Sequence, residues 1–133
     1  MPLLRIKALL GGDGSGSEVD GTLPYSIIAA ATTNANLVKA GPGVITVIHT
    51  INQAAALRYL KFYDMNVLPT AGSGTPVRRY PIPASTTGLG FILQPAIPLK
   101  FLAGIAFTIT AGQADNDTTA LAAGDVTLTL EYN

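Results

Sequence analysis

The sequence predicts an all-β fold: a single-domain, jelly-roll-like antiparallel β-sandwich of about eight strands. Apolar and polar residues alternate along most of the chain, and no window shows apolar residues at helical spacing between clean caps. The segments between the alternating runs, such as GPG, PTAGSGTP and QPAIP, are built from residues that form turns. Short strands separated by such turns are typical of sandwiches.

The alternation places the strands and sorts their faces. We expect strands at residues 25–32, 37–39, 44–51, 57–64, 77–82, 89–93, 105–111 and 126–132. Along residues 126–132 every second residue is apolar, so one face of this strand should pack in the core while the other meets water. Along residues 57–64 both faces mix apolar and charged side chains, which predicts that the second face touches a neighbour.

The first part of the chain differs from the rest in composition. We expect residues 1–22 to form an extended N-terminal arm and a Gly/Ser-rich linker, followed by the sandwich domain at residues 23–133. The arm contains the apolar-rich segment PLLRIKALL, in which Leu4, Ile6 and Leu10 are candidates for strand pairing. The edge that they would pair with stays open: it belongs either to the domain's own sheet or to a neighbouring chain.

The charge content is low for a free monomer. Charged residues make up 12% of the 133 residues and apolar residues 48%, whereas charged residues reach roughly 25% in typical soluble domains. With so few charges to solvate the outside, we expect partner subunits to cover part of it, as in a homo-oligomer, a dimer or trimer.

Composition also argues against several classes of protein. Eight basic and eight acidic residues cancel, and no basic run exceeds Arg78-Arg79, so a nucleic-acid partner is not expected. The uncharged runs are interrupted by Pro and Gly, so no membrane-spanning helix is expected. There is no cysteine for disulfides or thiolate metal sites. No signal-peptide pattern is visible, so we expect synthesis in a cytoplasm.

Nothing in the sequence has the pattern of an active site. The single histidine, His49, lies within the alternating run VITVIHTIN and has no Ser-centred elbow motif with it. The glycines of GGDGSGS do not lead into a helix and therefore do not form a phosphate-binding loop. We expect no catalytic residues, no cofactor and no enzymatic activity.

The stretch ADNDTT poses a choice between an ion site and a loop tip. Asp115 and Asp117 offer carboxylates for calcium, but an EF-hand loop also needs a central glycine and a closing glutamate, and DNDTTALAAGDV lacks both in the required places. Asp and Asn also bind their own backbone in ordinary loops. We expect a loop tip and no metal, with an irregular ion site as the open alternative.

Several of these segments together resemble a known class of proteins. The strand ending in KFYD at residues 61–64, the V..YPIP strand at 77–83 and the hairpin GIAFTITAGQADNDTTALAAGDV at 104–126 look like small cement or decoration proteins on the capsids of tailed bacteriophages. The resemblance covers residues 43–132. It implies a jelly-roll sandwich on the virion surface that binds the major capsid protein and stabilises the shell.

Interface candidates follow from this resemblance and from the residue types. Arg78 and Arg79 form the one adjacent basic pair, suited to an acidic patch on a shell or to protecting a sheet edge. By analogy, Asp115 and Asp117 would lie at a contact or an exposed tip.

A different class of function is a receptor- or glycan-binding head domain of a phage tail fibre or spike. It requires a concave patch of exposed aromatic side chains beside acids or amides. The candidate set is Tyr59, Tyr63 and Tyr80 with Asp64. Core or subunit-interface packing is the simpler explanation of these tyrosines.

Overall fold

The computed structural model describes residues 21–85 and 87–133, which form nine strands in two antiparallel sheets. The arm residues Leu4, Ile6 and Leu10 lie outside the described residues, and so the sheet edge that they pair with is not described either. The strands are β1 (Leu23–Ile28), β2 (Asn36–Lys39), β3 (Gly43–Asn52), β4 (Arg58–Asp64), β5 (Arg78–Ile82), β6 (Phe91–Leu93), β7 (Leu99–Phe101), β8 (Ile105–Thr110) and β9 (Val126–Tyr132).

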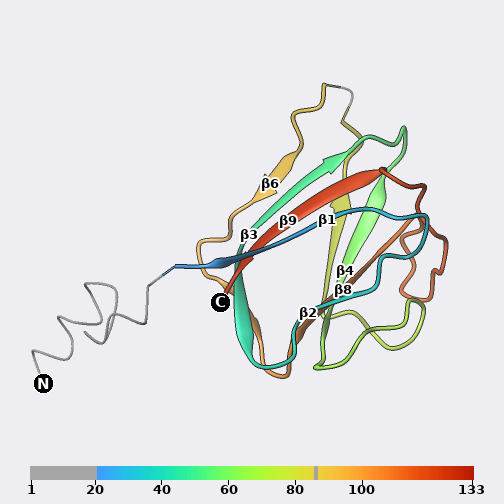
Figure 1. Cartoon of the computed structure of the whole chain (residues 1–133). Helices are drawn as coiled ribbons and strands as arrows, with labels where there is room; N and C mark the ends of the chain where they lie inside the picture. The colour runs from blue at the N-terminus through green and yellow to red at the C-terminus, as the bar shows by residue number, and fades with distance from the viewer. Residues whose placement is uncertain (1–20, 86) are drawn as a thin grey trace, which may run out of the picture.

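The strand order is that of a jelly roll. One sheet has the order β1-β9-β3-β6, with β7 also paired to β3, and the other has the order β2-β8-β4-β5. The first strand pairs with the last, the second with the last but one, and β4 with β5, so the chain is rolled up like one long hairpin. Figure 1 shows β6, β3, β9 and β1 side by side as one layer. The predicted all-β sandwich is confirmed.

The core lies between the two sheets. Phe62 of β4 is at its centre, with edge-to-face ring contacts to Tyr80 (6.0 Å between centroids), Phe101 (5.8 Å) and Phe107 (6.2 Å). Both sheets and two loop residues, Ala29 and Leu121, supply buried side chains to it. The residues from the sheets are Ile45, Ile48, Leu60, Phe62, Ile82, Phe101, Ile105, Phe107, Ile109, Val126, Leu128 and Leu130. In β9 the alternation is as predicted, with Val126, Leu128 and Leu130 buried.

Two strand predictions were wrong. The strand expected at residues 25–32 ends at Ile28, because Asn34 adopts a left-handed conformation (φ 50°) and its side chain closes a turn on Ala30 and Thr32. The strand β7 was missed. It is only three residues long and follows a proline, so its sequence gives no measurable alternation.

Candidate functional site

The candidate site is the outer face of the four-stranded sheet, on the side away from the core. Lys61 in the middle of β4 is paired with Thr108 of β8 on one side and with Arg79 of β5 on the other. Tyr59 and Tyr63 flank Lys61 on the same face, because side chains two residues apart in a strand point the same way. The outer face therefore carries a row of polar and aromatic groups.

The segment 111–125 between β8 and β9 folds back over this face. The ammonium of Lys61 donates hydrogen bonds to the carbonyl oxygens of Gly112 (3.2 Å) and Ala114 (2.5 Å). The side chain of Lys61 is 0% exposed. Burial lowers the pKa of Lys61, and the carboxylates of Asp117 and Asp115 act in the opposite direction. The predicted cover on the second face of β4 is thus the chain itself rather than a neighbour.

Asp115 pairs with Arg79 at the outer border of this cover. The guanidinium donates two hydrogen bonds to the carboxylate, Nε to Oδ1 at 2.5 Å and the terminal nitrogen to Oδ2 at 2.6 Å. The hydrogen bond from Arg79 lowers the pKa of Asp115. Two residues that the sequence suggested separately as contacts therefore bind each other across 36 positions of chain.

Asp117 folds the segment onto itself. Its carboxylate accepts hydrogen bonds from the backbone N–H of Gly112 (2.9 Å) and from both the backbone N–H and the hydroxyl of Thr119 (3.1 and 2.9 Å). Burial raises the pKa of Asp117, but the hydrogen bonds from Thr119 and Gly112 outweigh it, so the pKa lies below its ordinary value.

These contacts show how the two carboxylates of ADNDTT are used within the chain. The carboxylate oxygens of Asp115 and Asp117 are directed at an arginine, at backbone N–H groups and at a threonine. Residues 21–85 and 87–133 contain no group of three or more His, Asp or Glu side chains arranged to hold a metal ion. The segment is a loop fastened to its own sheet, the use of Asp that connecting loops commonly make.

Two hollows flank the covered face. The first, about 330 Å³, is lined by Leu57, Tyr59, Lys61, Arg79, Pro81 and Gln113. The second, about 470 Å³, lies at the end of β4 among Tyr63, Asp64, Met65, Val67, Leu68 and the following segment up to Val77. The walls of both hollows mix apolar and polar atoms.

The aromatic set suggested for glycan binding is not brought together. Tyr59 lines the first hollow and Tyr63 the second, while Tyr80 is turned to the core, where its ring meets Phe62. The Asp64 carboxylate accepts the backbone N–H groups of Leu102 (3.0 Å), Ala103 (2.7 Å) and Gly104 (3.2 Å). The four residues Tyr59, Tyr63, Tyr80 and Asp64 therefore do not form one concave patch.

Arg78 and Arg79 differ in role although they are neighbours. Successive residues of a strand face opposite ways. Arg78 lies on the inner side, over the ring of Phe101 (5.1 Å) and bonded to the carbonyl of Lys100 (3.3 Å), while Arg79 faces outward to Asp115. Each is occupied within the chain.

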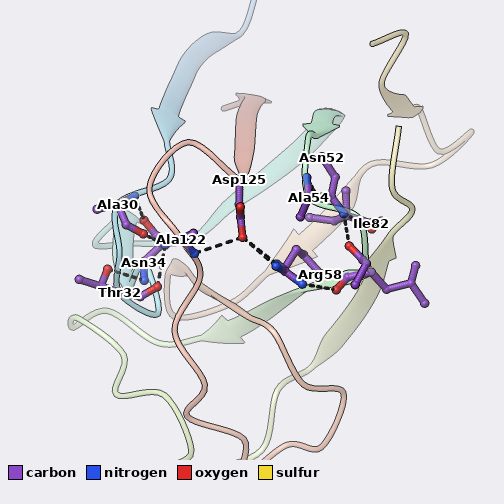
Figure 2. A network of polar contacts seen from close by, with 11 residues as sticks. Ala30, Thr32, Asn34, Asn52, Ala54, Arg58, Ile82, Ala122 and Asp125 are labelled. Carbon is purple, nitrogen blue, oxygen red and sulfur yellow. Dashed lines mark hydrogen bonds and ion pairs between the residues drawn. The ribbon is translucent and has the colours of Figure 1, made fainter. Parts of the chain in front are cut away.

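Sequence reasoning missed a polar network that fastens the loops at one end of the sandwich, shown in Figure 2. Arg58 forms an ion pair with Asp125 (2.9 Å), whose carboxylate also accepts the backbone N–H of Ala122 (3.1 Å). The side chain of Asn52 donates to the carbonyls of Ala56 and Ile82, both at 2.9 Å. Arg58 and Asp125 are 67 positions apart, so no spacing in the sequence links them.

Comparisons with known proteins add no relative. No protein-family model, no curated protein and no solved structure matches this chain. The function is therefore inferred from the residues and their geometry.

A separate finding concerns membranes. Among the residues that the structure describes, no helix has the length and apolar character needed to cross a bilayer.

Proposed function

We propose that this chain is a non-enzymatic virion structural protein: a cement or decoration protein on the outer surface of a phage head, where it stabilises contacts between major capsid protein subunits. Its partners are the major capsid protein and further copies of itself. It is made in the host cytoplasm and resides in the virion. The sequence resemblance to cement proteins suggests this role, and the surface of the sandwich supports it.

One observation carries the proposal: many large apolar side chains are exposed on a chain with few charges. Among residues 21–85 and 87–133, eleven large apolar side chains are between 37% and 81% exposed. They are Leu23, Ile28, Leu57, Val67, Leu68, Val77, Leu89, Phe91, Ile92, Ile97 and Leu102. Exposed apolar side chains, together with polar groups that are bonded within the chain at the candidate site, favour a protein whose function is to bind other proteins through its surface.

Binding to an assembled shell explains how such a protein acts without chemistry. A ligand that binds only the assembled state stabilises that state by mass action, and the effect multiplies over the many copies on a lattice. A gain of about 1–3 kcal/mol per copy is enough, since about 1.4 kcal/mol is a tenfold change in an equilibrium constant.

The test is the melting of capsids with and without this protein, with and without a calcium chelator. We expect shells that lack the protein to open at lower temperature and the chelator to have no effect on shells that carry it. Shells that melt identically in both states would refute the proposal. A loss of shell stability in the presence of the chelator would indicate that Asp115 and Asp117 bind a calcium ion.

A second candidate function, receptor or glycan recognition by a tail-fibre or spike head, rests on the first hollow alone. There Tyr59 lies beside Gln113 and Arg79, a combination of aromatic face and polar groups that sugar sites use. A glycan-array screen with the Tyr59→Ala variant as control tests it: binding that is lost with Tyr59 would support this function over the cement role.

A further inference from the structure

The outer face of the five-stranded sheet carries few charged side chains. One row across it reads Ser26, Thr129, His49 and Ile92, in strands β1, β9, β3 and β6. The next row reads Ile28, Thr127 and Ile51. None of these residues is charged at neutral pH, given a neutral histidine. These two rows therefore carry no charged side chain.

The two charges on this face have opposite sign. Glu131 of β9 stands opposite Val47, and Lys100 of β7 opposite Val44, so both side chains point outward at the same end of the sheet. Neither takes part in the two ion pairs found within residues 21–85 and 87–133, which are Arg58–Asp125 and Arg79–Asp115. The hydroxyl of Thr22 donates to the Glu131 carboxylate at 2.8 Å.

The positions of these two charges make the face complementary to itself. Across the sheet, β3 lies between β9, which carries Glu131, and β7, which carries Lys100. A two-fold axis lying on the face along β3 would exchange the two sides. Lys100 is level with Asn133 at the end of β9, two residues beyond Glu131, so Lys100 of each copy would come near Glu131 of the other, twice, with an offset of roughly 7 Å along the strands that the long lysine side chain can bridge. The same axis would lay the exposed Ile92 of each copy over the Thr129 of the other.

We propose that two copies of this chain pack face to face through their five-stranded sheets, about a two-fold axis near β3, with reciprocal Lys100–Glu131 ion pairs. The strands of the two sheets would be aligned within about 30°, as in sandwiches. A second copy is the partner that this face fits, because the face supplies both members of the charge pair. The role of such a dimer on a shell rests on the proposed function, whereas the dimer itself does not.

The area of the sheet shows which residues the dimer must cover. Four strands about 4.8 Å apart and about six residues long at about 3.4 Å each give a flat area of roughly 400 Å². A standard interface takes about 800 Å² of accessible surface from each partner. The apolar rim beside β6, with Leu89 and Ile97 exposed at 81% and 80%, therefore has to be part of the contact.

Charge reversal tests the register of the dimer. The full-length chain, studied by sedimentation and light scattering from about 1 to 100 μM, is expected to have twice its monomer mass of 13.7 kDa. Lys100→Glu or Glu131→Lys alone should raise the dissociation constant at least about tenfold, because like charges then meet twice. The double variant Lys100→Glu/Glu131→Lys should restore the dissociation constant to within about threefold of the wild type.

A matched pair of variants tests the apolar rim. Ile92 and Leu68 are both 62% exposed, but Leu68 lies outside the proposed interface, in the segment after β4. Ile92→Lys should give a monomer, while Leu68→Lys should remain a dimer, and thermal melting of each confirms that it is folded. A wild-type monomer at 100 μM, a charge reversal without rescue, or equal effects of the two lysines would overturn the inference.

Shell-melting measurements on the same variants separate the two proposals. In one outcome, the wild type is monomeric in solution and the Ile92→Lys variant no longer binds or stabilises shells. This face then binds the capsid protein, so the inference of a dimer fails and the cement role stands. If the dimer forms with the expected charge rescue but shells are indifferent to it, the dimer stands and the cement role fails.

Discussion

At the scale of single residues, the most informative side chain is Lys61. A lysine is almost never fully buried unless its charge is compensated, and here two backbone carbonyls and two nearby carboxylates do so. The hydroxyls of Tyr63 and Thr108, on the same face, are buried without a hydrogen-bond partner among the described residues. The covered face is therefore held by the ammonium of Lys61 more than by its neighbours.

Replacing Lys61 separates packing from hydrogen bonding. Lys61→Ala should lower the free energy of unfolding by about 2–4 kcal/mol, since it leaves a cavity and two unpaired carbonyls. Lys61→Met keeps most of the volume and should cost less. Urea unfolding of the two variants measures the difference. Equal losses in both variants would show that the hydrogen bonds dominate over packing.

Asp64 makes the free energy of unfolding depend on pH in the acidic range. The backbone N–H of Leu102 is the largest cause that holds the pKa of Asp64 below its ordinary value of 3.8, with further N–H groups from Ala103 and Gly104. The folded protein therefore binds fewer protons than the unfolded chain near that pH, and the free energy of unfolding rises with pH there. This contribution is complete above about pH 5 and is lost as pH falls through the folded pKa.

The Asp64→Asn variant tests this dependence. It keeps one acceptor oxygen, for the Ala103 and Gly104 N–H groups, but loses the charge and the second oxygen that accepts the Leu102 N–H, so we expect a loss of stability at pH 7 of about 1–2 kcal/mol. The difference between the wild type and the variant should shrink as pH falls from about 5 to 2. Unfolding curves at several pH values measure it. A difference that stays constant with pH would contradict the assignment.

At the scale of elements, two long loops form a layer outside the four-stranded sheet. The segment 65–77, between β4 and β5, meets the segment 111–125 where Gly72 lies against Thr118 and Asn116. Gly72 has a positive φ of 80°, and a Cβ there would lie 2.6 Å from Thr118 Cγ2 and 3.0 Å from the Asn116 carbonyl oxygen. The two loops thus touch through a position that only glycine fits.

Two glycines provide a matched test of this contact. Gly74 has nearly the same φ, 75°, but open space where its Cβ would lie. Gly74→Ala should cost about 1 kcal/mol from the left-handed backbone alone. Gly72→Ala should cost at least about 1 kcal/mol more, because the segment 111–125 must also move. Hydrogen exchange should then be faster at residues 111–120 in Gly72→Ala only. Equal exchange in both variants would mean that the loops are not coupled.

At the scale of the whole molecule, the rolled-hairpin order ties the two ends of the chain together. β9 is the central partner of β1 and β3, so the five-stranded sheet cannot close until the last strand has been made. Sandwiches dominated by such long-range pairing fold slowly, on a scale of about milliseconds to seconds.

Truncation tests this dependence on the last strand. A chain that ends at residue 125 lacks β9 and should lose its cooperative unfolding transition, because β1 loses the one partner strand that it has within the described part of the chain and β3 loses its longest pairing. Circular dichroism during thermal melting measures the transition. A truncated chain that still unfolds in one cooperative step would show that the four-stranded sheet is stable alone.

The sequence by itself determined the fold class and most of the strands. In β9 apolar and polar residues alternate throughout, because one face of this strand is buried and the other is not. The sequence pattern therefore predicts which residues are buried. β8 was also predicted, at residues 105–111, but its alternation does not reveal that all six of its residues are buried. β7 was missed because it is too short to alternate. Alternation therefore locates a strand but does not show whether its polar face is covered.

Only the tertiary structure decided how the polar residues are used. Asp115 and Arg79 were separate surface candidates in the sequence, and Lys61 and Arg58 were not candidates at all, yet each has its partner far along the chain. Their pairing depends on the register of β4 with β5 and β8, and on loops that return across the sheet. Such contacts join residues that no local spacing relates, because a rolled hairpin places distant segments side by side.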